Sequence, residues 1–445
     1  MAHHTHTASV SAALPAGYEL RTPHHAFRIV RAIASGGFGI TYQARNLVAF
    51  QAPGTTRVVP EGALLALKEC FRTDVMERTA TGEARPVAGE AAAVASLREQ
   101  FLNEAFTLMR LREACPAEQR ANAEQMGFVP IFHAGRIPAG GGETAVHYFV
   151  MPYLTGGSLR GHAGRMTPEQ VVRTAYRLLR ALRVLHRDAH AGEPVLHRDI
   201  KPENIMLTET GMPVLIDFGI SSGTDNVGGT PDYSPHEQIR RTRMGRFTDL
   251  YSLGATLYEL VAGTKCPRYD ARPPYTESDP YRPLAADAAA VAAFREYGRA
   301  FEREFAAVAG RPYKPRRQDF AVSFLMGIDT ALRTRETGSS TVPGRWQSAT
   351  QWMENVFQGV EPACKGPTAA QRRARERAES ETVWLADYGD SPAGEPAASR
   401  ASSPPSEPGG GWTRKLLIAA IVVVSFILLA LTLQYILHSY GITHI

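Results

Sequence analysis

Hydrophobic positions divide the chain into a strand-like beginning and a longer helical part. Further along, in the stretches 171–185 and 250–260, apolar residues recur every three or four positions, which predicts amphipathic helices. A small sheet-rich part followed by a larger helical part indicates one α+β unit with two lobes, over residues 27–358. The strand-like runs near the start are FRIVRAI, GITYQA and LLALKEC.

A different apolar pattern lies near the C-terminus. The segment from Leu416 to Leu437 contains no charged residue. As a helix it would be roughly 33 Å long, at about 1.5 Å per residue, enough to cross a hydrocarbon core of about 30 Å. Arg414 and Lys415 precede it and no Lys or Arg follows, so the positive-inside rule places the N-terminal side in the cytoplasm. We therefore expect a single-pass transmembrane helix over 416–437, located in the cell (inner) membrane.

Three segments are predicted to lie outside any folded unit. Residues 1–26 carry no signal-peptide pattern and are expected to be a flexible N-terminal segment. Residues 359–413 are rich in Pro, Gly, Ser and Arg, which is typical of a flexible linker, and 438–445 would be a short tail. Arginines between positions 372 and 377 are interleaved with glutamate. They are either a solvated helical turn or a weak contact with anionic lipid.

Composition excludes several classes of protein. The net charge is +5, less than a dedicated nucleic-acid binder usually carries, so no nucleic-acid partner is expected. Hydrophobic residues make up 44% of the chain, which is enough for a sizeable core. The four cysteines lie far apart and form no C-x-x-C pair. This excludes a zinc knuckle, a redox motif and a disulfide-stapled scaffold, and it indicates reduced thiols.

A glycine-rich turn and a lysine are the first candidates for chemistry. The sequence SGGFG (35–39) lies between two strand-like runs, and glycines allow a backbone to approach a phosphate closely. Lys68 lies in the next run. Farther on, Glu104 falls within an apolar helical stripe that extends from 97 to 111. Because a charge in such a stripe is costly unless it is paired, Lys68 is its natural partner.

Two carboxylates and an amide bracket a short hairpin. Asp199 and Asn204 lie in VLHRDIKPENIML (195–207), and Asp217 follows in LIDFG. Oxygen ligands of this kind suit hard cations such as Mg²⁺. Together with the glycine-rich turn and Lys68, these motifs in this order resemble bacterial eukaryotic-like serine/threonine protein kinases, members of the protein kinase superfamily.

The resemblance implies a bilobal protein kinase fold, with a small β-rich N-lobe and a larger helical C-lobe, and ATP-dependent phosphorylation of serine or threonine in proteins, the chain itself included. ATP and Mg²⁺ would be the cofactors, with Mn²⁺ as an alternative metal; protein substrates would be the partners, and homodimerisation stays open. Asp199 would accept the proton of the substrate hydroxyl, and Lys201 would contact the transferring phosphate. Asn204 and Asp217 would bind the metal. The ATP site would consist of Ile33, Ala34, Ser35, Gly36, Gly37, Phe38, Gly39, Thr41, Lys68 and Glu104.

The resemblance extends into GTPDYSPHEQ (229–238), which is similar to the end of an activation segment. In the family, a glutamate at this place pairs with an arginine, here Arg345, and an aspartate, here Asp249, opens the central helix of the C-lobe. Ser222 and Thr224 are the candidate autophosphorylation sites. The residues singled out in the activation segment are Ser222, Thr224, Thr230 and Glu237.

The chain also departs from the family pattern. Ala34 replaces the first glycine of the phosphate loop, and 51–62 is expected to be a hairpin insertion. The region 265–317 is either surface decoration or a docking surface. A second H-R-D at 186–188 lacks the following lysine and asparagine, and we interpret its Asp188 as a surface residue at the end of a helix. Two alternatives in function remain: a pseudokinase-type membrane scaffold that binds nucleotide and partners without turnover, and a small-molecule phosphotransferase.

Overall fold

The described residues lie within the compact unit Met1–Thr382. No helix among them has the length and apolar composition needed to cross a membrane. The span predicted over 416–437, and nearly all of the linker predicted over 359–413, lie outside the residues that the structure describes. The computed structural model describes residues 12–37, 39–52, 57–79, 84–113, 122–138, 145–186, 194–218, 229–267, 282–315, 319–333 and 345–362, together with Gly82, Cys115 and Arg120.

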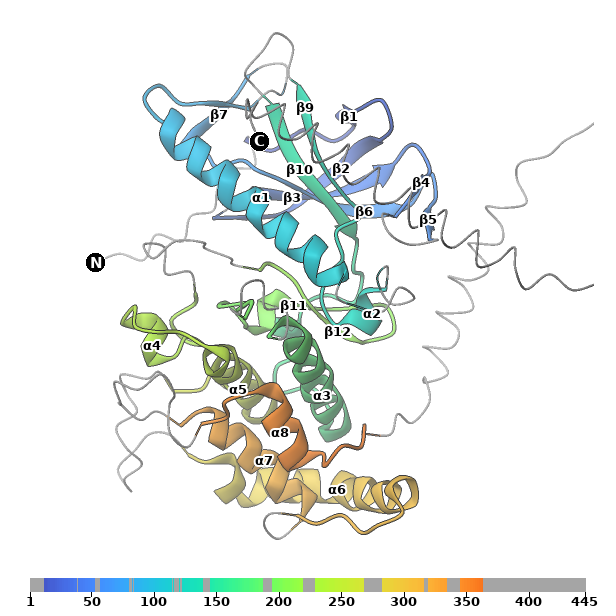
Figure 1. Ribbon diagram of the computed structural model, residues 1–445, viewed down its shortest axis with the longest axis vertical. Helices are drawn as coiled ribbons and strands as arrows, with labels where there is room; N and C mark the ends of the chain where they lie inside the picture. Colours follow the sequence, from blue (N-terminus) through green and yellow to red (C-terminus); the bar gives the residue numbers. More distant parts are fainter. Residues whose placement is uncertain are drawn as a thin grey trace, which may run out of the picture. The chain divides into compact units, whose positions relative to one another are not determined.

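An antiparallel sheet of six strands forms the first lobe (Figure 1). The apolar runs predicted as strands are β2, β3 and β6; β6 is buried on both faces from Leu65 to Glu69, whereas in β3 buried side chains such as Tyr42 and Ala44 alternate with more exposed ones. This alternation is what a sheet with one covered face requires. The strand order is β1 (Glu19–Arg21), β2 (Ala26–Gly36), β3 (Gly39–Asn46), β6 (Leu64–Glu69), β10 (Ala145–Pro152) and β9 (His133–Pro138).

Helix α1 (Ala91–Glu113) crosses one face of this sheet (Figure 1). The ring centroids of Phe101 on the helix and Phe149 on β10 lie 4.9 Å apart. The predicted apolar stripe is the buried face of the helix, and Glu104 within it is only 4% exposed. The helix therefore delivers a buried carboxylate to the sheet.

Two small hairpins extend the sheet lobe. β4 (Phe50–Gln51) pairs with β5 (Val58–Val59), which is the hairpin insertion predicted over 51–62. β7 (Met76–Arg78) pairs with β8 (Ala84–Pro86). The second hairpin follows β6 in the chain and carries Arg78.

The boundary predicted at residue 27 falls inside the sheet. β1 pairs with β2 along its whole length, and Leu14 and Leu20 are buried in the core. The segment expected to be flexible over 1–26 is therefore part of the lobe from Ala12 onward. Isolated apolar residues and a strand of three residues produce no periodic signal, because periodicity needs a longer window.

The second lobe is mainly helical, and the helices predicted over 171–185 and 250–260 are confirmed as α3 and α5. Thr167 caps α3 by accepting a hydrogen bond from the backbone N–H of Gln170, and Pro168 occupies the first turn, as expected at a helix start. Between α3 and α5 lies the short β11–β12 hairpin that carries the H-R-D and D-F-G motifs at its ends. The elements are α2 (Ala123–Met126), η3 (Leu159–His162), α3 (Pro168–Leu185), η4 (Pro202–Asn204), β11 (Ile205–Leu207), β12 (Pro213–Leu215), α4 (His236–Ile239), α5 (Arg246–Ala262), η6 (Leu284–Ala286), α6 (Ala288–Ala309), α7 (Phe320–Ala331) and α8 (Ala349–Val356).

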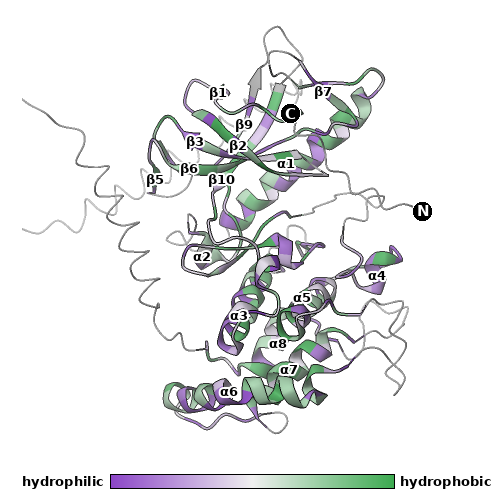
Figure 2. Cartoon of the chain, turned by 180° about the vertical axis from the view of Figure 1, so that it is seen from behind, coloured by the Kyte–Doolittle hydropathy of each residue, from purple (hydrophilic) through white to green (hydrophobic). Residues whose placement is uncertain are grey.

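The region 265–317 contributes to the core as well as to the surface. Helix α6 buries Phe301 and Phe305, and the ring centroids of Phe301 and Phe320 of α7 lie 4.0 Å apart. Figure 2 shows α7 coloured mainly as hydrophobic and α6 with mixed colours. This pattern fits a helix with one face packed against α7 and the other facing solvent. Surface decoration alone, one of the two alternatives for this region, is therefore incorrect.

Candidate active site

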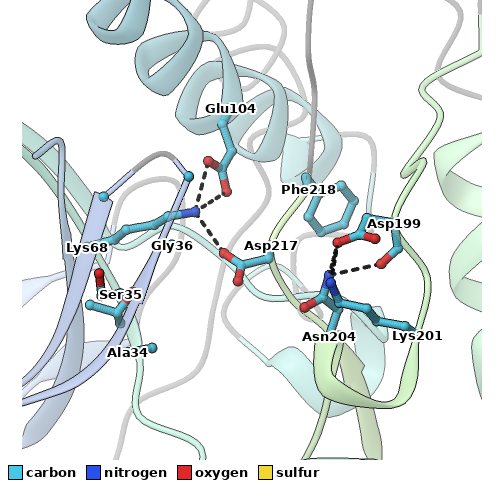
Figure 3. Close-up of a pocket in the computed structure, with 13 residues that line it drawn as sticks. Ala34, Ser35, Gly36, Lys68, Glu104, Asp199, Lys201, Asn204, Asp217 and Phe218 are labelled. Carbon is cyan, nitrogen blue, oxygen red and sulfur yellow. Dashed lines mark hydrogen bonds and ion pairs between the residues drawn. The ribbon is translucent and has the colours of Figure 1, made fainter. Parts of the chain in front are cut away.

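Lys68 is the centre of an ion-pair network that joins the two lobes (Figure 3). Its Nζ lies 3.0 Å from Oε1 of Glu104 on α1 and 2.7 Å from Oδ1 of Asp217, after β12. The Lys68 and Glu104 side chains are 7% and 6% exposed, whereas Asp217 is 51% exposed. The pair predicted from the apolar stripe on α1 is therefore present, and its lysine also reaches the D-F-G aspartate.

The electrostatics of this network follow from its burial. Burial lowers the pKa of Lys68, but the carboxylates of Asp217 and Glu104 outweigh it and raise that pKa above its ordinary value. Burial raises the pKa of Glu104 to about 7, against the opposing effect of Lys68. Lys68 holds the pKa of Asp217 below its usual value. Above a pH of about 7, the site thus holds a charged ammonium between two carboxylates.

The glycine-rich turn covers this network. Gly36 and Gly39 face each other in the β2–β3 hairpin, and Gly39 lies so close to β6 that a Cβ there would be 1.9 Å from the backbone oxygen of Glu69. Only glycine permits this approach. The turn and the network line one cavity of about 230 Å³, formed by Ala34, Ser35, Gly36, Gly37, Gly39, Thr41, Lys68, Glu104, Asp199, Lys201, Asn204, Asp217 and Phe218.

Two residues predicted for the ATP site are not among those lining this cavity. Ile33 is 36% exposed and lines a neighbouring cavity on the outer side of the glycine-rich turn. The register of β2 against β3 shifts between Ala32 and Ala34, so the regular alternation of strand side chains is interrupted at Ile33. Phe38 lies outside the described residues.

Asp199 forms a compact group with three polar side chains on the opposite side of the cavity. Its Oδ2 accepts a hydrogen bond from Asn204 Nδ2 at 2.8 Å and lies 2.8 Å from Lys201 Nζ. Its Oδ1 accepts a hydrogen bond from the Thr230 hydroxyl at 3.0 Å, and Lys201 Nζ donates to that hydroxyl at 2.7 Å. The structure thus brings Thr230 of the activation segment to the H-R-D aspartate.

The donor set fits a hard cation. Because Asn204 uses its Nδ2 to donate to Asp199, its side-chain oxygen is left as an acceptor. Asp217 adds a half-exposed carboxylate within the same cavity. One amide oxygen and one carboxylate, with room for phosphate and water, suit Mg²⁺ better than softer metals. Among the described residues, no group of three or more His, Cys, Asp or Glu side chains could hold a metal ion.

The loop that carries the H-R-D motif, 197–201, corresponds to the catalytic loop implied by the resemblance, and helix α5 holds it. The Asp249 side chain, which is fully buried, accepts hydrogen bonds from the backbone N–H groups of His197 and Arg198, each at 2.9 Å. Arg198 has a φ of 65° and Asp217 a φ of 53°, and non-glycine residues adopt such positive values only where the surroundings impose them. The anchoring by Asp249 is one such constraint on the loop.

His186 is a residue of this anchor that the sequence interpretation missed. It ends α3, is 3% exposed, and its Nε2 lies 3.0 Å from Oδ2 of Asp249. The sequence interpretation concerned Asp188 of the second H-R-D, as a surface residue, and assigned no role to its histidine, which is buried. The remaining two residues of that motif, 187–188, lie outside the described residues. A histidine at the last position of an apolar helical stripe was the available signal.

The activation segment is described only in its second half. Ser222 and Thr224 lie outside the described residues. Glu237, at the start of α4, forms a buried ion pair with Arg345, with Nη1 and Oε1 2.7 Å apart. The pairing predicted by the resemblance is therefore present, and it fastens the end of the segment to the region before α8.

Comparisons with known proteins agree with this geometry. Residues 141–277 match the family model described as protein kinase domain. A probable serine/threonine-protein kinase of Streptomyces coelicolor is 31% identical over 205 residues, 43% of this chain and 28% of that protein. A probable serine/threonine-protein kinase PknB of Bifidobacterium longum is 30% identical over 240 residues, 50% of this chain and 31% of that protein. The matches thus span about a third or less of these curated relatives.

Among solved structures, one titled "PpkA-294 apo form" is 23% identical, with a TM-score of 0.47, and the match covers 78% of this chain and 99% of that chain. The family match at 141–277 encloses the activation-segment motif and the H-R-D and D-F-G motifs, and residues of the latter two line the cavity. Over this region the chain is similar to protein kinases, and the relatives it matches are named as probable bacterial serine/threonine-protein kinases.

Proposed function

We propose that the protein transfers the γ-phosphoryl group of ATP to serine or threonine hydroxyls of protein substrates. The observation that carries this proposal is the shared cavity, in which the Lys68 ammonium, the Asp217 and Asn204 oxygens and the Asp199–Lys201 pair face one another. Phosphoryl transfer needs mainly positioning and charge neutralisation, and these groups supply both.

Each residue has a defined part in the proposed reaction. Lys68, held by Glu104, binds the α- and β-phosphates, and Asn204 and Asp217 would hold Mg²⁺, which supplies further positive charge to the phosphates. Asp199 orients the substrate hydroxyl and takes its proton as the new O–P bond forms. The bond between the γ-phosphorus and the bridging oxygen breaks, and ADP leaves with that oxygen.

The nucleotide site is tested by two substitutions and a control. Lys68→Ala and Asp217→Asn should each lower phosphate transfer to a protein substrate by about 10²-fold or more, because each removes charge that faces the phosphates. Glu77→Gln is a matched control, since Glu77 is half exposed and forms an ion pair with Arg85 on the β7–β8 hairpin. Near-parental turnover in both site variants would refute the assignment.

The pseudokinase alternative makes a different prediction for the parent protein. A scaffold would bind nucleotide but show no turnover that depends on Asp199. Radiolabelled ATP assays of the parent and of Asp199→Ala distinguish the two, because only an enzyme loses its signal on this substitution. Comparison of phosphoproteins in cells with and without the gene would then identify substrates. Mass spectrometry of active protein tests whether Ser222 or Thr224 is phosphorylated.

We also propose that the chain is anchored by a single transmembrane helix over 416–437, with the kinase domain in the cytoplasm. The support is the uncharged apolar run and the basic residues before it, which the positive-inside rule interprets as a cytoplasmic flank. Fractionation of the full chain beside a version ending at Gly411 tests this. A full chain that stays soluble without detergent, or a C-terminal tag accessible only from the cytoplasm, would contradict the proposal.

A further inference from the structure

A second charged network lies behind the nucleotide site, on the opposite face of β6. Lys68 and Glu69 are consecutive on this strand, so their side chains point to opposite faces. Lys68 enters the cavity, whereas Glu69 is completely buried on the outer side. There the Arg78 guanidinium binds both carboxylate oxygens, with Nη1–Oε1 at 3.0 Å and Nη2–Oε2 at 2.8 Å. The Tyr42 hydroxyl donates to Oε2 at 2.7 Å.

The network also holds the N-terminal segment. Arg78 Nε donates to the backbone oxygen of Ala12 at 2.6 Å. The backbone N–H of Leu14 donates to the Tyr42 hydroxyl at 3.0 Å, and Leu14 itself is buried. Arg78 therefore connects the start of the domain with the strand that carries Lys68. A two-pronged guanidinium–carboxylate pair of this kind fixes geometry as well as charge.

Glu69 lies next to both phosphate-binding features. It follows Lys68 in sequence, and its backbone oxygen is the atom that a Cβ on Gly39 would meet at 1.9 Å. It is also paired with Ile40 across the β3–β6 ladder. Ala12 and Ala13 line one cavity with Ile33 to Gly37, so the N-terminal segment borders the outer face of the glycine-rich turn. A shift of Glu69 would therefore move the lysine and the turn together.

We infer that Arg78, acting through Glu69, and the segment 12–14 are positioning elements of the nucleotide site that set how the phosphates are held. This inference rests on the proposed kinase function. Neither Arg78 nor the segment 12–14 is among the residues that line the nucleotide cavity. Their effect should therefore appear in nucleotide binding and not in the recognition of the protein substrate.

The test uses two perturbations of the full chain. Arg78→Lys keeps the charge but cannot bind both carboxylate oxygens and Ala12 at once. A chain that starts at Ala16 loses both backbone contacts. Each should raise KM for ATP by about tenfold and leave KM for the protein substrate within about twofold. Because both changes act through one element, the combined variant should raise KM for ATP by less than the product of the two separate increases.

Matched controls separate positioning from loss of folded protein. Arg85→Lys alters the exposed ion pair with Glu77 on the same hairpin, and a chain that starts at Ala12 keeps both contacts. Both should match the parent. A merely structural role would lower the fraction of active sites, measured by titration with a nucleotide analogue, without changing KM for ATP. That result, or a parental KM in both test variants, would overturn the inference.

A second variant and a binding measurement test the same inference if Arg78→Lys folds poorly or if the protein transfers no phosphate. If Arg78→Lys yields too little folded protein, Tyr42→Phe removes the hydroxyl that joins Leu14 to Glu69 while keeping the ring, and it should raise KM for ATP in the same direction. If the parent binds nucleotide without transferring phosphate, the proposed function fails. The same variants, compared by their affinity for a fluorescent ATP analogue, then still support or overturn the inference.

Discussion

Substitution of Arg345, which forms an ion pair with Glu237, should lower the free energy of unfolding more than most single substitutions in the second lobe. Arg345 Nη1 lies 2.7 Å from Oε1 of Glu237, and the two side chains are 1% and 9% exposed. Arg345 Nε also donates to the backbone oxygen of Arg333 at 2.9 Å. Arg345→Met leaves the Glu237 carboxylate buried with the Thr248 hydroxyl as its remaining side-chain partner, at 3.2 Å. Loss of one partner from a buried pair costs about 3–5 kcal/mol.

Thermal melting can measure this cost against two comparisons. For a domain of this size, about 2 °C is expected per kcal/mol, so Arg345→Met should melt roughly 6–10 °C below the parent. Arg295→Met, which removes an exposed arginine 3.3 Å from Asp319, should cost less than about 1 kcal/mol. The double variant Glu237→Met/Arg345→Met should recover much of the loss, because no uncompensated charge remains. If Arg345→Met and Arg295→Met had the same melting temperature, the reasoning would be refuted.

Three further outcomes are expected. Because the pKa of Glu104 is raised to about 7, its carboxylate, which pairs with Lys68, is protonated as pH falls through that value. The kcat/KM for ATP should therefore fall as pH drops through about 7. Glu104→Gln should have a lower kcat/KM that lacks this pH dependence, as matched pH profiles would show. Gly39→Ala should lower the free energy of unfolding by about 1–3 kcal/mol because of overpacking, as thermal melting would show. Gly37→Ala, whose Cβ would meet nothing within 4 Å, should have the melting temperature of the parent. Asp249→Asn should lower kcat with little change in KM for ATP, because one backbone N–H of the catalytic loop loses its acceptor; equal losses in both constants would contradict this.

Much of the site could be predicted from the sequence because its parts lie in short, ordered motifs. Asp199 and Asn204 are five positions apart on one loop, so local spacing alone puts them together. The long-range pair of Lys68 and Glu104 was also predictable, because a carboxylate inside an apolar stripe needs a buried cation. In both cases a local pattern carried the information about a contact.

The contacts that were missed lack such a pattern. Glu69 follows Lys68 and could have been recognised as a carboxylate on the covered face of a strand. Its partner Arg78 lies on a strand of only three residues, and nothing in the spacing distinguishes it from the exposed Arg85. Leu14 and Leu20 are isolated apolar residues in a segment without periodicity. His186 was hidden by its place in a motif that resembles the catalytic one.

The anchoring of the catalytic loop by Asp249 has a consequence for local opening of the protein. Loops usually open with little free energy, and their amides exchange hydrogen quickly. The N–H groups of His197 and Arg198, however, donate to a side chain in the first turn of α5, a helix buried along nearly its entire length. These two amides can exchange only when their hydrogen bonds to the buried Asp249 carboxylate break. In a deuterium-exchange map they should therefore follow the slowest amides of α5, although they lie on a loop at the edge of the cavity.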